Sequence, residues 1–389
     1  MHTDPVVFTI FLIFTGAAAL ATLVLYARQS MLVAYIVLGM LLGPSGAGLV
    51  EDAEMTRQVA EIGIMFLLFL LGLDLYPQKL VGLFRETVLV TGVSSALFAA
   101  AGAALGWALG FNGMESLIIG AALMFSSTII GLKLLPTTVL HHRHTGEIII
   151  SVLLLQDLIA IIILLLLQAS GQRGMPVGQI VLVLLSLPAL VLFAWAFERF
   201  VLITLIRRFD SIHEYIFLLA IGWCLGMAQL AHAMGLSHEI GAFIAGVALA
   251  TSPIALYIAD SLRPLRDFFL VIFFFTLGAR FDVAILMEVL LPATLLAALS
   301  LTLKPLVFRF LLHRSGEALH RSREVGARLG QISEFSLLIA VLALEQEIIG
   351  RQASYLIQVA ALLTFMVSSY VIVMRYPTPI AVSDRLRRD

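Results

Sequence analysis

The chain has 389 residues, of which 61% are apolar and only 13% are charged. A soluble domain has about 45–50% apolar and about 25% charged residues, and the mean hydropathy of +1.04 shows the same excess. This composition excludes an ordinary soluble fold and predicts an all-α polytopic membrane protein. The sequence contains no basic domain that would support nucleic-acid binding. The single cysteine, Cys224, excludes a disulfide framework.

Thirteen apolar segments are long enough to cross a bilayer, which takes about 20 residues of helix. The first is too long for a signal peptide, and no Lys or Arg precedes it. The predicted spans are residues 6–26, 31–50, 57–75, 87–109, 114–135, 146–168, 178–205, 213–234, 239–257, 265–281, 284–312, 324–345 and 354–374.

The basic residues between these spans predict the orientation of the chain. When loops and the adjoining ends of the spans are assigned alternately to two sides, nineteen Lys and Arg residues fall on one side and four on the other, with Lys304 deep inside a span. Short cytoplasmic loops carry the excess of Lys and Arg. We therefore expect a multi-pass protein of the inner (plasma) membrane, with the N-terminus outside and the C-terminus cytoplasmic.

A weak internal repeat appears when the chain is shifted by about 207 residues. Gly39 then falls on Gly246, residues 66–75 fall near 271–282, and Ser126 falls on Ser333. Each match pairs one span with the seventh span after it. Because seven is odd, the second copy runs through the membrane in the opposite direction, as in inverted-repeat transporters with a site at the bilayer midplane. The alternative is chance, because small residues are common in all membrane helices.

The repeat divides the chain into parts. We predict a transmembrane domain over residues 1–375 and a cytoplasmic tail over residues 376–389. Within the domain, repeat one covers about 1–168, a linker helix covers 178–205, and repeat two covers about 213–375.

Asp157 lies near the centre of the sixth span, in an apolar sequence with only Gln156 as a polar neighbour. An ionisable group at that depth costs at least about 2.5–3.5 kcal/mol, so it indicates a functional site. The carboxylate is protonated, paired or bound to a cation. The alternative is a permanently protonated Asp in a helix–helix hydrogen bond.

Further polar residues interrupt other spans. Lys304 lies in the eleventh span, where it either serves the site or extends to the cytoplasmic face. Ser126, Ser127 and Thr128 interrupt the fifth span, and Glu334 lies at the matching place in the twelfth. Broken helices at the midplane direct their ends at ions. Ordinary packing, with the hydroxyls bonded back to their own helix, is the alternative.

Several segments resemble the membrane domain of Kef-type potassium/proton antiporters, in the second cation:proton antiporter family, which is sodium/hydrogen exchanger-like. They include "FLLFLLGLDL" (66–75), "SSTIIGLKLL" (126–135), "LLLQDLIAI" (153–161) and "LGQISEFSLLIAVLAL" (329–344). The Gln-Asp pair at 156–157 is similar to that of the potassium-selective, electroneutral members, whereas electrogenic sodium antiporters tend to have two adjacent acids.

This resemblance implies a homodimer in membrane lipid, with a dimer domain and a moving core domain in each subunit. The core has two crossed, broken helices, which correspond here to the fifth and twelfth spans. Asp157 is implied as the carboxylate that binds K⁺ (or Na⁺) and the proton. Gln156, Ser126, Ser127 and Thr128 surround it, and Lys304 and Glu334 are supporting charges. No cofactor is implied beyond the transported ions.

Many Kef-type proteins continue into a cytoplasmic nucleotide-binding domain, but no GxGxxG motif occurs in this sequence. Regulation by a separate cytoplasmic nucleotide-binding subunit, a longer natural chain, and the absence of such regulation are the three alternatives.

The resulting hypothesis is a secondary antiporter that exchanges K⁺ for H⁺ without net charge. Na⁺/H⁺ exchange is the nearest alternative, and a cation channel or a proton-gated sensor on the same scaffold is a second. The absence of a TVGYG-type filter argues against a channel. The absence of HExxH and GxSxG argues against an intramembrane enzyme.

Overall fold

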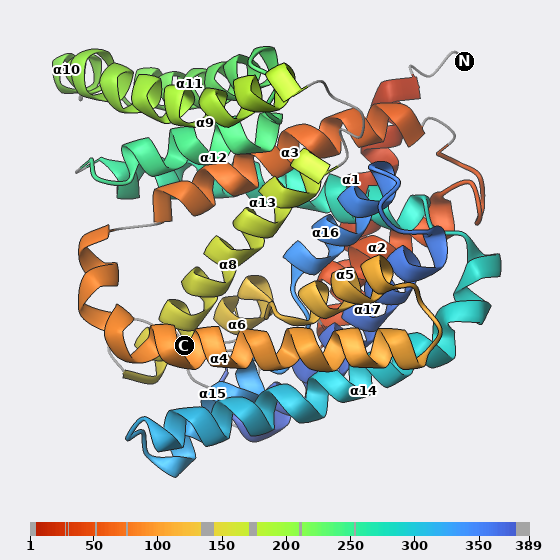
Figure 1. Cartoon of the computed structure of the whole chain (residues 1–389). Helices are drawn as coiled ribbons and strands as arrows, with labels where there is room; N and C mark the ends of the chain where they lie inside the picture. Colours follow the sequence, from red (N-terminus) through yellow and green to blue (C-terminus); the bar gives the residue numbers. More distant parts are fainter. Residues whose placement is uncertain are drawn as a thin grey trace. The chain divides into compact units, whose positions relative to one another are not determined.

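The computed structural model describes residues 5–27, 29, 31–50, 53–74, 77–133, 144–170, 177–209, 212–252 and 254–378. Every regular element within these ranges is a helix (Figure 1), so the all-α prediction is confirmed. The chain packs as two compact units. Unit 1 contains Met1–Ala17, Tyr35–Leu80 and Gln172–Arg280, and unit 2 contains Ala18–Ala34, Val81–Gly171 and Phe281–Asp389. Each unit thus combines segments of both predicted repeats.

Helices that belong wholly or mainly to unit 1 are α1 (Pro5–Tyr26), α2 (Met31–Leu42), α3 (Ala53–Asp74), α9 (Val177–Phe197), the π-helical turn η1 (Glu198–Leu202), α10 (Ile203–Arg208), α11 (His213–Ala233), α12 (His238–Leu249) and α13 (Ala255–Ala279). Those of unit 2 are α4 (Pro77–Ala108), α5 (Gly113–Leu123), α6 (Thr128–Lys133), α8 (His144–Ser170), α14 (Val283–Arg314), α15 (Leu319–Arg328), α16 (Glu334–Glu345) and α17 (Arg351–Arg375).

Among the described residues, eight helices are long and apolar enough to cross a membrane, and α2, α5 and α12 are shorter apolar helices. The exact number of thirteen spans therefore stays a prediction. The predicted boundaries at 257 and 265 are wrong. The helix of the ninth predicted span, α12, ends at Leu249, and the Ser252 N–H donates a hydrogen bond to the Leu249 carbonyl. The next helix, α13, already begins at Ala255. Proline follows Ser252 in the sequence and disfavours a helical conformation of the residue before it.

Unit 1 contains two helix crossings at which glycine is required. A Cβ added to Gly39 on α2 would lie 2.0 Å from the Phe275 carbonyl oxygen of α13, and one added to Gly278 would lie 2.0 Å from the Ile36 oxygen of α2. The crossing of α3 with α12 has the same form, since a Cβ on Gly246 would lie 2.1 Å from the Phe69 oxygen. The 207-residue shift that relates Gly39 to Gly246 exchanges these two crossings, as the predicted repeat requires.

Replacing Gly246 with alanine is expected to lower thermal stability. The new methyl group meets backbone, which cannot move as a flexible side chain would, and overpacking costs about 1–3 kcal/mol or more. Gly222 on α11 is the matched control, because a Cβ there meets nothing within 4 Å. Gly222→Ala should keep or raise the unfolding temperature, since alanine favours a helix. Equal shifts of the two unfolding temperatures in detergent would contradict the crossing argument.

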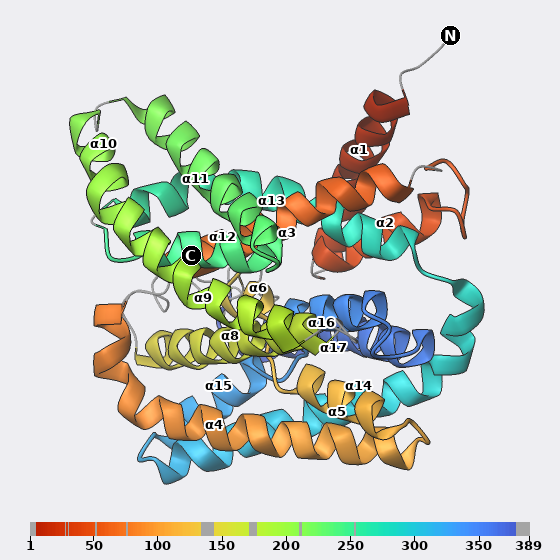
Figure 2. The ribbon, with the colours of Figure 1, turned by 45° about the horizontal axis from the view of Figure 1, so that its top comes forward.

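In unit 2, α4 and α14 run side by side, with α8, α16 and α17 next to them (Figure 2). Phe98 of α4 packs edge-on against Phe308 of α14, with ring centroids 5.4 Å apart. Gly102 of α4 approaches α5 closely, since its added Cβ would lie 2.9 Å from the Gly120 Cα. This packing brings α4, α5 and α14 together around the interruption between α5 and α6.

The first residues of the predicted tail belong to unit 2. Arg328 is fully buried at the end of α15, forms an ion pair of 2.9 Å with Glu324, and donates a 2.8 Å hydrogen bond to the Pro377 carbonyl. Its guanidinium lies over the Tyr376 ring. Residues 376 and 377 therefore pack against the end of α15, whereas the division into domain and tail stays a prediction and residues 379–389 lie outside the described residues.

Candidate ion site

The fifth predicted span is interrupted at its polar sequence. Helix α5 ends at Leu123, residues 125–127 are not helical, and α6 begins at Thr128. The Ser127 hydroxyl accepts a hydrogen bond from the Ile130 N–H at 3.1 Å, as a helix cap does. Ser126 and Ser127 are fully buried. The prediction of a broken fifth span is thus confirmed.

The twelfth predicted span is also interrupted. Helix α15 ends at Arg328, residues 329–333 are not helical, and α16 begins at Glu334. The Ser333 hydroxyl caps α16 by accepting from the Phe335 N–H at 3.1 Å. Glu334 is buried, with 6% of its surface exposed, in the first turn of α16. An acid at that position is favoured by the helix dipole.

The two interruptions contact each other directly. The Ser126 hydroxyl donates to the Leu329 carbonyl at 2.8 Å, and the Gln331 amide donates to the Ser127 carbonyl at 3.4 Å. The Ser336 hydroxyl of α16 donates to the Ala122 carbonyl of α5 at 2.6 Å. Backbone groups that the broken helices leave without a helical partner are thereby paired inside the protein, as a lipid environment requires.

Asp157 lies on α8, and only 1% of its surface is exposed. The Thr128 hydroxyl donates to its Oδ2 at 3.4 Å. The expected contact between the sixth span and the start of α6 is therefore present. It places a carboxylate beside the interruption of α5 and α6, where backbone and hydroxyl oxygens also gather.

Gln156 bonds to the backbone at the interruption between α5 and α6. Its Oε1 accepts from the Ser126 N–H at 3.0 Å, and its Nε2 donates to the Met124 carbonyl at 3.0 Å. Both ends of the amide thus stabilise the interruption, because they satisfy one backbone donor and one backbone acceptor of the broken helix. Its predicted role as an ion ligand stays a prediction.

Lys304 joins the two interruptions. The side chain is completely buried on α14, so the alternative of an extension to the membrane surface is wrong. Its Nζ donates to the Phe125 carbonyl at 2.6 Å and to the Gln331 carbonyl at 2.9 Å, and lies 3.4 Å from the Ser126 hydroxyl. The Nζ also lies 5.6 Å from the centre of the Phe98 ring. One side chain therefore holds a carbonyl of each broken helix.

Sequence reasoning missed the polar residues that complete this network. Ser300 donates to the Gly330 carbonyl at 2.9 Å, and Thr364 accepts from the Ile332 N–H at 3.0 Å. Ser368 donates to the Gln331 side-chain oxygen at 3.0 Å. Gln331, a buried amide three residues before Glu334, is the one of these residues that hydropathy alone could have indicated. Single Ser and Thr residues are too common in membrane helices to stand out.

The arrangement provides oxygen ligands from a carboxylate, hydroxyls and carbonyls, which suit hard cations. A buried carboxylate can also bind a proton in place of a cation. Among the residues that the structure describes, no group of three or more His, Cys, Asp or Glu side chains could hold a metal ion.

Two interrupted helices that meet beside a buried carboxylate, within a polytopic helical protein, define the class of secondary transporters. Residues 10–374 match the family described as "Sodium/hydrogen exchanger, transmembrane". The chain belongs to this family of cation/proton antiporters, and the resemblance noted in the sequence is confirmed.

Two curated relatives show the range of the family. The iron transporter MagA of Paramagnetospirillum magneticum is 27% identical over 357 residues, which cover 88% of this chain and 79% of MagA. The glutathione-regulated potassium-efflux system protein KefC of Salmonella schwarzengrund is 29% identical over 336 residues, 84% of this chain and 54% of KefC. This chain thus spans about half the length of KefC.

The fold is that of a solved antiporter. The sodium proton antiporter MjNhaP1 of Methanocaldococcus jannaschii superposes with a TM-score of 0.71 over 95% of this chain and 99% of its own. The sequences are 16% identical, so this likeness concerns the fold alone.

Proposed function

We propose that this protein exchanges K⁺ for H⁺ by alternating access around Asp157. The observation that carries the proposal is the buried Asp157 carboxylate beside the α5–α6 interruption, in contact with Thr128. The potassium-efflux relative KefC supports K⁺ as the cation, and the sodium antiporter fold supports Na⁺ as the alternative.

Exchange of one K⁺ for one H⁺ follows if the two ions compete for a single carboxylate. Asp157 binds either a proton or a cation, so the loaded site has the same net charge in both directions of the cycle. Gln156 is neutral and adds no second acid next to it. Lys304 already donates to a carbonyl of each broken helix, which favours a structural role over a proton-carrying role.

We further propose the inner (plasma) membrane, with the N-terminus outside, on the basis of the uneven distribution of basic residues. The homodimer and the separate regulatory subunit that the resemblance implies stay predictions.

Proton flux in sealed proteoliposomes tests the proposed exchange. Imposed K⁺ gradients should drive proton movement, with Na⁺ gradients as the second arm. Fe²⁺ forms a third arm, because one relative is named an iron transporter. Clamping the membrane potential with valinomycin should leave the rate of K⁺-driven exchange unchanged, since no net charge moves. A steep dependence of the rate on voltage, or flux driven by Na⁺ and not by K⁺, would refute the proposal in its present form.

A further inference from the structure

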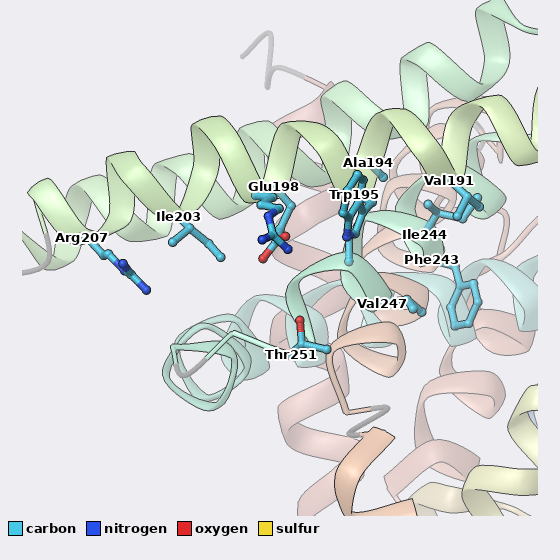
Figure 3. Close-up of a pocket in the computed structure, with 12 residues that line it drawn as sticks. Val191, Ala194, Trp195, Glu198, Ile203, Arg207, Phe243, Ile244, Val247 and Thr251 are labelled. Carbon is cyan, nitrogen blue, oxygen red and sulfur yellow. The ribbon is translucent and has the colours of Figure 1, made fainter.

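A cavity of about 780 Å³ lies within unit 1, between the continuous rod α9–η1–α10 and helix α12 (Figure 3). This volume lies within the range of about 300–1,000 Å³ that is typical of ligand sites. Several lining residues are exposed, Val191 to 48% and Trp195 to 51%, so the cavity is open at its rim.

The cavity has a polar end and an apolar end. Arg207, Ile203 and Glu198 follow one another from one end in Figure 3, with Thr251 opposite them, and Phe243 and Val191 lie at the other end. Trp195 lies between the two ends. This division within one cavity of a membrane protein matches the two halves of a phospholipid.

The charges at the polar end match a phosphate. Arg199 and Arg207 both line the cavity and are exposed, and neither forms an ion pair with a carboxylate among the residues that the structure describes. The Arg199 guanidinium lies 5.7 Å from the centre of the Trp195 ring, which holds it at the border of the polar end. Arginine is suited to phosphate because its donors can bind two oxygens at once.

Glu198 contributes a buried carboxylate to the lining of the cavity. Its residue surface is only 6% exposed, and the Arg199 guanidinium interacts with it electrostatically without forming an ion pair. A carboxylate within a membrane span asks for a functional reason. It begins the π-helical turn Glu198–Leu202, and such turns often occur at functional sites.

We propose that this cavity binds phosphatidylethanolamine. The phosphate lies between Arg199 and Arg207, the ammonium group donates to the Glu198 carboxylate, and one acyl chain lies along Val191 and Phe243. Choline cannot donate such hydrogen bonds, because its nitrogen is fully methylated. The neutral glycerol of phosphatidylglycerol cannot neutralise Glu198. This site is independent of the ion that the protein transports.

Native mass spectrometry of the purified, delipidated protein tests the proposal. The probes are dioleoyl phosphatidylethanolamine, phosphatidylglycerol and phosphatidylcholine, each titrated separately. Phosphatidylethanolamine should bind about fivefold or more tightly than phosphatidylcholine, and Arg199→Gln or Arg207→Gln should each weaken its binding about fivefold. Glu198→Gln should reduce the affinity for phosphatidylethanolamine to the phosphatidylcholine value.

Arg208→Gln is the matched control. Arg208 neighbours Arg207 on α10 and is exposed, but it lies near the Phe209 ring and does not line the cavity. Its replacement should change none of the three affinities. The proposal is wrong if Arg208→Gln weakens binding as much as Arg207→Gln, or if the three lipids bind alike and Glu198→Gln has no effect. Unchanged unfolding temperatures verify that each variant is folded.

Discussion

Replacing Asp157 with asparagine is expected to abolish K⁺-driven proton exchange, down to the level of vesicles without protein. Asparagine has nearly the same shape and can still accept the hydrogen bond from Thr128. It can carry neither a negative charge nor an exchangeable proton. Because burying a neutral amide costs less than burying a carboxylate, the unfolding temperature should stay the same or rise.

The combination of lost exchange and retained stability separates a functional carboxylate from a structural one. A permanently protonated Asp157 that only links helices would give the opposite pair of results, with some loss of stability and retained exchange. Asp260→Asn is a suitable control, because the Asp260 side chain is 61% exposed on α13. It should change neither the proton flux nor the unfolding temperature. Coupled exchange by the Asp157→Asn variant would rule out the single-carboxylate mechanism.

The second large effect is expected for Lys304→Met, which should lower stability and slow exchange together. The Phe125 and Gln331 carbonyls would each lose the donor that the Lys304 Nζ provides. A buried acceptor without a donor costs about 1–3 kcal/mol, so two of them cost about 2–6 kcal/mol in the folded state. Unfolding in detergent and proton flux in proteoliposomes measure the two effects.

Lys304→Gln is the informative companion to this variant. Its amide still donates hydrogen bonds but has no charge and carries no proton. If Lys304 mainly holds the two broken helices together, Lys304→Gln should recover part of the lost stability and exchange, and that exchange should still not respond to voltage. If Lys304 were instead a second proton carrier, the voltage dependence of exchange would change between wild type and Lys304→Gln. Such a change would contradict the role inferred from its contacts.

The polar residues of the candidate site could be predicted from the sequence because lipid makes them costly. Asp157, Lys304 and the polar run at 126–128 stand out in apolar segments, and the structure brings them into one network. The order of matches between the two repeats also indicated that the interruptions in the fifth and twelfth spans correspond. Roles of these residues in transport are predictions that the experiments above address.

Other features required the tertiary structure. The sequence predicted Gln156 near the ion, and only the structure shows that its amide bonds to the Met124 carbonyl and the Ser126 N–H of the broken helix. Ser300 and Thr364 gave no signal, because a single hydroxyl in a membrane helix is ordinary until a backbone group without a partner lies next to it.

Composition and residue pattern are enough to predict a helical protein embedded in a membrane, and they indicate where the helices are interrupted. These properties depend on the cost of placing single residues in lipid, which each residue carries wherever it lies in the fold. The packed fold was needed to show which carbonyl Lys304 contacts, why Gly246 must lack a side chain, and that Glu198 and Arg207 line one cavity. Those properties belong to pairs of groups distant in the chain, and packing alone brings such pairs together.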